Sequence, residues 1–375
     1  MKQNLFLIAI IFLAVSCKKA TSLYDVHEVD CVNKSEVTIK GVPVSVELPL
    51  DIRDIAVCDS FLIVTGHDDD ARMSVYSSDW KYLGRYCFIG RARNEFLHDP
   101  GMVSGQILRG KDGHALIPLK DGLECVRVVD LQRSLEAGRT VISNECSYKP
   151  YKEAVIEEEF GTVTARNDIN FVFIDNDIRH QFEWCRPMLM NGTVRIDPYY
   201  AVMNDTTVVR NVSTLSLFNE EQFKFIHGDL FKHPSRNLVI FPLNYIDYIL
   251  MIDVDNDRIT AIHQQGSLSF DDQLPYVDFT TTHFGQAVCT ESYFMVLYCA
   301  GDINKDASES KDVKPELMFF DWEGNFIRSV ILDTRVYRIA FDEKKQILYG
   351  VDSDNDRIIS FDLSSVMTDT NDSNS

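Results

Sequence analysis

VYRIAFDEKKQILYGVDSDNDRIISFDL, residues 336–363, is the clearest copy of a unit that recurs along the chain. It reads as three short strands, separated by the charged turn EKKQ and the acidic turn SDNDR. Apolar residues that alternate within short runs, with turn-forming residues between the runs, are typical of an antiparallel meander. No helix fits this pattern, so the unit predicts a small β-sheet.

Five further stretches repeat this unit, at residues 52–90, 102–142, 161–196, 225–266 and 283–332. The first aligns with 336–363 residue for residue, IRDIAV against VYRIAF. In this alignment Asp54 and Arg338 occupy equivalent positions. Self-similar units of roughly 30 to 50 residues, each a small sheet, are the signature of a β-propeller. A β-sandwich also has many short strands, but it would not explain the aligned inner strands. The sequence therefore predicts an all-β, six-bladed β-propeller.

The two ends of the repeat region are each anomalous. Residues 37–48, VTIKGVPVSVEL, alternate like a strand but have no neighbour in sequence, and Pro43 and Pro49 restrict them to a sheet edge. The sixth unit lacks an outermost strand, because only the polar SSVMTDTNDSNS follows Leu363. We expect residues 37–48 to join the last blade and close the ring, so that the propeller spans 37–363 and residues 364–375 form a disordered polar tail.

The N-terminus carries an export signal. Lys2 precedes an apolar run at residues 5–15, which is too short to span a bilayer permanently and is typical of a secretory signal. Ala14-Val15-Ser16-Cys17 resembles the lipobox of bacterial lipoproteins, which implies removal of residues 1–16 and lipidation of Cys17. An ordinary signal peptide that contains a cysteine is the alternative. Residues 17–36 are polar and are expected to form a tether.

Composition limits the partners and the chemistry. The formal charge is −20, which disfavours nucleic acid and anionic lipid as partners through bulk electrostatics. Nine cysteines include no CxxC and no Cys/His zinc spacing, and Cys31 and Cys146 are the only pair that we would test for a disulfide. The sequence predicts no metal and no cofactor.

One local stretch supports a family resemblance. Residues 82–96, YLGRYCFIGRARNEF, resemble the first-blade ending G-x-G-P-x-E-F of TolB-like or NHL-like six-bladed β-propeller lipoproteins of Bacteroidetes-type bacteria. Gly90, Glu95 and Phe96 match that motif, whereas Ala92 and Arg93 replace its glycine and proline. The resemblance implies the propeller fold and a lipid-anchored place in the cell envelope. Members of the family are mostly of unassigned function, so the resemblance implies no activity.

In this group of lipoproteins, acidic residues soon after the lipidated cysteine accompany display on the cell surface. Residues 18–22, KKATS, contain no acidic residue. This favours a protein that is anchored in the outer membrane and faces the periplasm.

Two acidic stretches look like calcium loops. DVDNDRI at 253–259 and DSDNDRI at 352–358 place carboxylates at alternate positions, but Arg258 and Arg357 stand where an EF-hand needs glycine. Solvated hairpin turns are therefore the favoured interpretation.

The central funnel of a propeller is the expected site for a ligand. Alignment of the inner strands assigns to it Arg53, Asp54, Gln106, His227, Gln286 and Arg338, with Arg91, Arg93 and Glu95 on an entry loop. An ion-paired, water-filled channel without a ligand is the alternative. If a ligand binds, the arginines suggest a carboxylate or a phosphate.

These observations predict a non-catalytic envelope lipoprotein whose propeller binds a partner protein, peptide or glycan. The competing hypothesis is an enzyme like the metal-dependent lactonases and lyases that also use six blades. Those enzymes hold a divalent metal with glutamate, asparagine and aspartate. Here the aligned residues are Asp54, Gln106, Gln286 and Arg338, a poor metal cage because one member is itself a cation.

Overall fold

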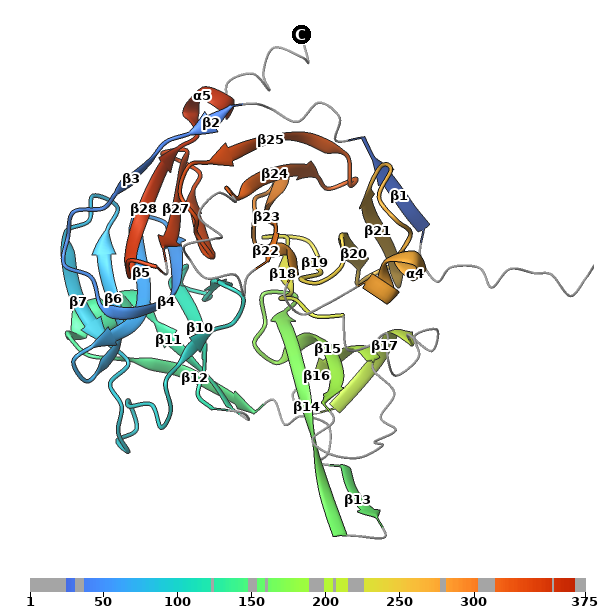
Figure 1. Cartoon of the computed structure of the whole chain (residues 1–375). Coiled ribbons are helices and arrows are strands. Elements are labelled where there is room, and N and C mark those ends of the chain that lie inside the picture. Colours follow the sequence, from blue (N-terminus) through green and yellow to red (C-terminus); the bar gives the residue numbers. More distant parts are fainter. Residues whose placement is uncertain are drawn as a thin grey trace, which may run out of the picture.

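The strands form six sheets that follow one another in chain order around a ring (Figure 1). The computed structural model describes residues 25–30, 37–122, 125–147, 154–158, 161–188, 199–204, 207–214, 226–276, 281–302, 314–352 and 354–367. The chain is a six-bladed β-propeller, as predicted. The predicted signal peptide, Cys17 and Cys31 lie outside the described residues. Within them, no helix has the length and apolarity needed to cross a bilayer.

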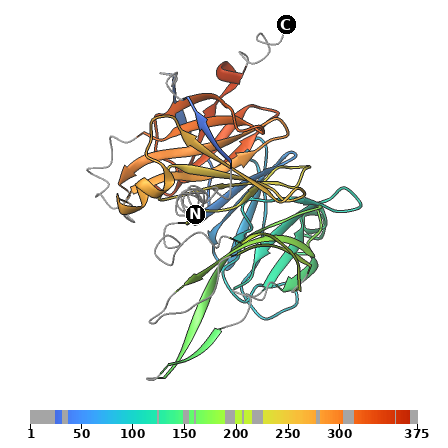
Figure 2. The same cartoon turned by 90° about the vertical axis from the view of Figure 1, so that its right-hand side faces the viewer.

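Each blade is a sheet of consecutive antiparallel strands, to which the N-terminal segment adds outer strands in blades 4 to 6. Blades 1 and 2 consist of β4 (Leu50–Cys58), β5 (Phe61–Asp68), β6 (Ala71–Ser77) and β7 (Tyr82–Tyr86), then β8 (Gly101–Met102), β9 (Leu108–Arg109), β10 (Ala115–Lys120), β11 (Cys125–Asp130) and β12 (Ile142–Ser147). Blade 3 consists of β13 (Ala154–Glu158), β14 (Gly161–Phe173), β15 (His180–Met188), β16 (Tyr199–Asn204) and β17 (Thr207–Thr214). The hairpin of β13 and β14 extends away from the other blades (Figures 1 and 2). Part of the third predicted unit, residues 189–196, lies outside the described residues.

Blades 4 to 6 complete the ring. They consist of β18 (Phe231–Lys232), β19 (Leu238–Pro242), β20 (Tyr248–Asp253) and β21 (Arg258–Gln264); β22 (Thr281–Cys289), β23 (Tyr293–Asp302), β24 (Glu316–Asp321) and β25 (Phe326–Leu332); and β26 (Arg338–Asp342), β27 (Ile347–Asp352) and β28 (Arg357–Asp362). Short helical segments connect strands: α2 (Leu131–Ala137), α4 (Phe270–Gln273) and η1 (Leu274–Tyr276).

The core is divided among the interfaces between blades. Six clusters of buried apolar side chains occur in the described residues, one at each interface between neighbouring blades. β19 illustrates the pattern: Val239 and Phe241 pack toward blade 3, whereas Ile240 packs toward blade 5. Both faces of each sheet are therefore buried, and alternate residues serve alternate neighbours.

The N-terminal segment is bound to three blades, not one. β3 (Gly41–Pro43) pairs antiparallel with β28 and gives blade 6 its outer edge. The strand predicted over 37–48 is divided, however, because β2 (Thr38–Ile39) pairs in parallel with β25 of blade 5. Beyond Pro43, Val44, Val46 and Leu48 pack between blades 6 and 1 without forming a strand.

The predicted tether and tail are each partly wrong. Within the predicted tether 17–36, β1 (Asp25–Val29) pairs in parallel with β21 as the fifth strand of blade 4, and Val29 is buried. At the other end, α5 (Ser364–Met367) lies within the predicted tail 364–375, and Val366 is buried between blades 5 and 6. Backbone pairing and burial of single apolar residues hold both segments, despite their polar composition.

Gly41 tests the contact of β3 with blade 6. A Cβ atom at this position would lie 2.4 Å from Ile359 Cγ2 and 2.8 Å from Phe361 Cε1. Gly41→Ala should lower the free energy of unfolding by about 1–3 kcal/mol, because it overpacks a closed contact. Gly101→Ala is the matched control, since a Cβ there meets nothing within 4 Å. Equal stability of the two variants in urea titrations would contradict this packing.

The acidic turns have different structural roles. Asp356, in the turn of blade 6, accepts hydrogen bonds from the backbone N–H groups of Asp51 (2.8 Å) and Ile52 (3.0 Å), and so ties blade 6 to blade 1. Asp257, in the turn between β20 and β21, forms an ion pair with Arg210. Both residues have positive φ, 47° and 53°, as expected for hairpin turns.

This difference predicts unequal effects of the same substitution. Asp356→Asn should cost about 1–2 kcal/mol of unfolding free energy, because two charge-assisted hydrogen bonds across the ring junction are weakened. Asp257→Asn keeps the turn and should cost less than about 0.5 kcal/mol, because its ion pair is partly exposed. Calorimetry of both variants measures the difference, and a larger loss for Asp257→Asn would refute the assignment.

Candidate functional site

The innermost strands surround a cavity of about 390 Å³ on the ring axis. All six blades contribute to its lining, and the equivalent stretches Ile55–Val57 and Ile339–Phe341 occupy equivalent places in it, as their sequence alignment predicts. Most residues of the lining are apolar in type, but the surface that they present to the cavity is more polar than apolar. The charged lining residues and their polar neighbours lie at or just after the ends of inner strands: Arg109, Asn176, Lys232, His233 and Glu343.

One end of the channel is crossed by a charged cluster. Arg338 Nε lies 3.4 Å from Asp54 Oδ1, and its Nη1 lies 3.2 Å from Asp229 Oδ2. Asp54 is on blade 1 and Asp229 precedes β18 of blade 4, so the three side chains span opposite blades of the ring. In sequence, each of the three residues comes just before the cavity-lining residues of its blade. The cluster therefore lies at the end of the channel where the inner strands begin.

The carboxyl of Asp54 has a strongly shifted pKa. Burial raises the pKa of its carboxyl to about 6, against the lowering effects of Arg338 and of the Met102 N–H, which donates to Oδ2 at 3.3 Å. Sequence alignment brought Asp54 and Arg338 together correctly. It did not predict Asp229, and for blade 4 it selected His227, two residues earlier, as the residue that faces the channel. The reason is that β18 is only two residues long and offers little periodicity.

The two predicted glutamines line the cavity but are already hydrogen-bonded. Gln106 donates to the carbonyl of Phe173 at 2.7 Å and accepts from its N–H at 2.8 Å, which joins blade 2 to blade 3. Gln286 accepts from the N–H of Ile339 at 2.6 Å, which joins blade 5 to blade 6. Both amides thus hold neighbouring inner strands together. Their carbonyl oxygens are engaged by backbone donors and are poorly placed to form a metal cage with Asp54.

The remaining predicted residues lie outside the cavity lining. His227 Nδ1 lies 3.0 Å from Asn244 Nδ2, and its ring lies tilted against the ring of Tyr245. Arg53 pairs with Asp51 at 3.1 Å and Asp99 at 3.3 Å in a partly exposed cluster. The structure therefore does not bring His227 or Arg53 into the cavity.

The family-like loop has a structural explanation. Glu95 accepts a hydrogen bond from the N–H of Ala92 at 2.9 Å, and its carboxylate fills the space where a Cβ on Gly90 would lie, 1.9 Å from Oε2. Phe96 is fully buried between blades 1 and 2. The matching glycine, glutamate and phenylalanine thus form one closed turn, and Arg91 and Arg93 are exposed on it.

The opposite end of the cavity carries polar residues that sequence reasoning missed. Arg109 forms two hydrogen bonds with Asp59, at 2.6 and 2.8 Å, and its backbone pairs with the Asn176 amide. Lys232 donates to the carbonyl of His233 at 2.9 Å, and burial lowers its pKa. Within the described part of the chain, no carboxylate forms an ion pair with Lys232. The exposed Glu343 completes this mouth.

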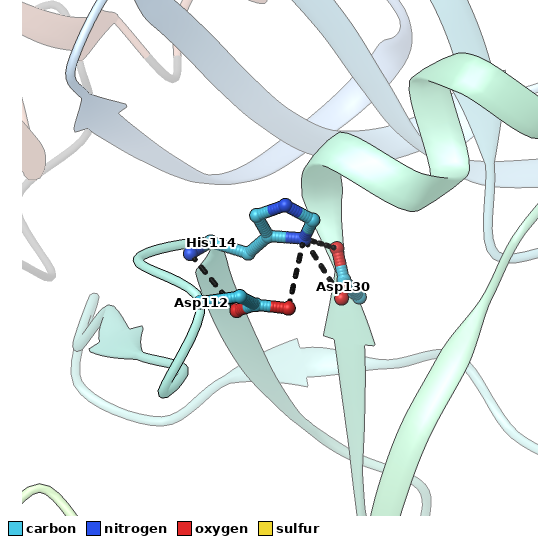
Figure 3. A group of neighbouring side chains, drawn as sticks. All are labelled: Asp112, His114 and Asp130. Carbon is cyan, nitrogen blue, oxygen red and sulfur yellow. Dashed lines mark hydrogen bonds and ion pairs between the residues drawn. The ribbon is translucent and has the colours of Figure 1, made fainter.

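A second polar cluster, on blade 2, has the ligand types of a metal site. Asp112, His114 and Asp130 point toward one another (Figure 3). His114 Nδ1 lies 3.1 Å from Asp130 Oδ1. Asp130 also caps α2 through the N–H of Arg133 at 3.0 Å, and the Arg133 side chain pairs with both carboxylates. These contacts give the cluster a structural role at the turn and the helix start.

Comparisons with known proteins were made for the sequence and the structure. No protein-family model matches the chain, and no curated protein matches it. Among solved structures, a member of the DUF4221 family from Bacteroides vulgatus has a TM-score of 0.48 at 10% identity, covering 87% of this chain and 98% of that chain. A putative exported protein from Bacteroides fragilis has a TM-score of 0.44 at 9% identity (90% and 98% covered), and BamB from Moraxella catarrhalis 0.40 at 11% (86% and 98%). These likenesses are weak, and the class of six-bladed β-propellers rests on the strand pairing described above.

The raised pKa of Asp54 predicts a specific pH dependence. Because the folded state holds this proton more tightly than the unfolded chain does, Asp54 costs stability as pH rises from about 4 to about 6. The unfolding free energy of the wild type relative to Asp54→Asn should therefore fall by up to about 3 kcal/mol over that interval. Glu323→Gln, which removes an exposed carboxyl instead, is the control. A difference that grows with pH would mean that Arg338 overcomes burial and stabilises the carboxylate.

Proposed function

We propose that this protein is a lipid-anchored envelope protein whose propeller binds a partner protein, peptide or glycan without catalysing a reaction. Its anchor is the acylated Cys17, and its place is the periplasmic face of the outer membrane. The lipobox-like Ala14–Cys17 and the absence of acidic residues at 18–22 support this location.

The observation that carries the binding role is the asymmetry of the central cavity. The Asp54–Arg338–Asp229 cluster crosses one end, so a ligand enters by the mouth that carries Arg109, Lys232 and Glu343. The volume of about 390 Å³ lies within the range of binding pockets and suits a side chain or a short terminus of a partner.

The hydrogen bonding of the cavity favours a binding role over the enzyme hypothesis. Gln106 and Gln286 are committed to the backbones of neighbouring blades, and Asp54 is adjacent to the guanidinium of Arg338. A divalent metal would have to displace these contacts and lie beside a fixed positive charge. Metal analysis of purified protein after calcium or zinc supplementation tests this point, and one bound metal per chain would favour the enzyme.

Cross-linked capture from native membranes tests the binding role. Tagged wild-type protein should retain a stoichiometric partner, and Cys17→Ser, which removes the anchor, should reduce that capture. Lys232→Glu should lower capture at least about tenfold, because charge reversal at the mouth removes the cation available to a ligand. Lys40→Glu makes the same charge change at an exposed position between β2 and β3, and should leave capture unchanged.

Two results would count against the proposal. Unchanged capture by Lys232→Glu would move the binding surface away from the cavity mouth. Failure of any protein, peptide or glycan to co-purify with the anchored wild type would remove the support for an adaptor.

A further inference from the structure

Strand β1 fixes the start of the described chain to one place on the ring. Its five residues pair in register with Thr260–Gln264 of β21, and the N–H of Gln265 donates to the carbonyl of Val29 at 2.7 Å. Val29 is buried among side chains of blades 4 and 5. The chain therefore enters the fold at the outer edge of blade 4 (Figure 1).

The length of chain before β1 limits the distance from a lipid anchor. Asp25 is eight residues after Cys17, and eight residues span at most about 29 Å when fully extended. The proposed acylation of Cys17, on which this inference rests, would hold the edge of blade 4 within that distance of the bilayer. Blade 1 lies on the opposite side of the six-membered ring.

Exposed apolar side chains occur on β1 and on the segment 265–276 that follows β21. Val26 in β1 is 46% exposed, Leu268 after β21 is 52% exposed, and Tyr276 at the end of η1 is 78% exposed. Tyrosine, with an apolar ring and a polar hydroxyl, suits the boundary between lipid and water. The exposed carboxylates Glu28 and Asp272 lie on the same segments, so electrostatics favour zwitterionic over anionic headgroups.

We propose that the outer edge of blade 4, formed by β1 and the segment 265–276, is a lipid-facing surface that rests on a zwitterionic membrane. The ring then stands on its edge, and both ends of the central channel face water. The mouth with Lys232 stays accessible to a partner in this orientation.

Site-specific photo-cross-linking to lipid tests this orientation. The photoreactive residue p-benzoylphenylalanine replaces Tyr276 in one variant and Tyr82 in another. Tyr82 is the matched control, because it is a 50% exposed tyrosine on the outer strand of blade 1. Each acylated protein is reconstituted in phosphatidylcholine vesicles and irradiated, and lipid adducts are quantified by mass spectrometry.

The adduct yield at position 276 should exceed that at position 82 by about fivefold or more, and should fall when phosphatidylglycerol replaces a third of the lipid. Equal yields, or a higher yield at position 82, would overturn the orientation while leaving the anchor intact. Absence of acyl mass on Cys17 would overturn the anchor and, with it, this inference. Unfolding curves that match the wild type verify that both variants are folded.

Discussion

Closure of the ring depends on pairing between the first and last parts of the repeat region. A propeller ring is closed only if its last blade has its outermost strand. The C-terminal unit supplies three strands of blade 6 and lacks this fourth one. β3 provides the missing edge, and Asp356 joins the same blade to the start of β4. β1 and β2 extend this closure by adding a parallel strand to each of blades 4 and 5. The segment that leads from the proposed anchor is thus part of the fold.

The closed ring determines what the channel can do. Six inner strands converge on the axis, where Asp54 and Asp229 approach from opposite blades and Arg338 lies between them. Gln106 and Gln286 join neighbouring inner strands in the same way, by meeting backbone groups of the next blade. The polar residues that suggest a binding funnel in the sequence therefore mostly stabilise the ring. The accessible polar groups lie at the other mouth, around Lys232.

Local sequence patterns predicted the parts of the fold that depend on local alternation. The number of blades, the equivalence of Ile55–Val57 and Ile339–Phe341, and the location of an edge strand near Gly41 all follow from period-two runs and turns. These patterns did not predict which strands pair when the partners are far apart in the sequence. The division of residues 37–48 between two blades depends on partners roughly 300 residues away, and the polar DVHEV of β1 gives no strong strand signal. Asp229 and Lys232 were missed because β18 is too short for alignment to set its register.

Native-state hydrogen exchange of the mature chain measures the closure most directly. The amides of Gln265, Ile331 and Val44 report on it, because they donate to Val29, Val37 and Ile358, one bond at each of blades 4, 5 and 6. The account predicts that all three exchange as slowly as amides of the central strands β20, β24 and β27, through global unfolding. Fast exchange at these three amides, with the central strands still protected, would mean that the N-terminal segment is not what closes the ring.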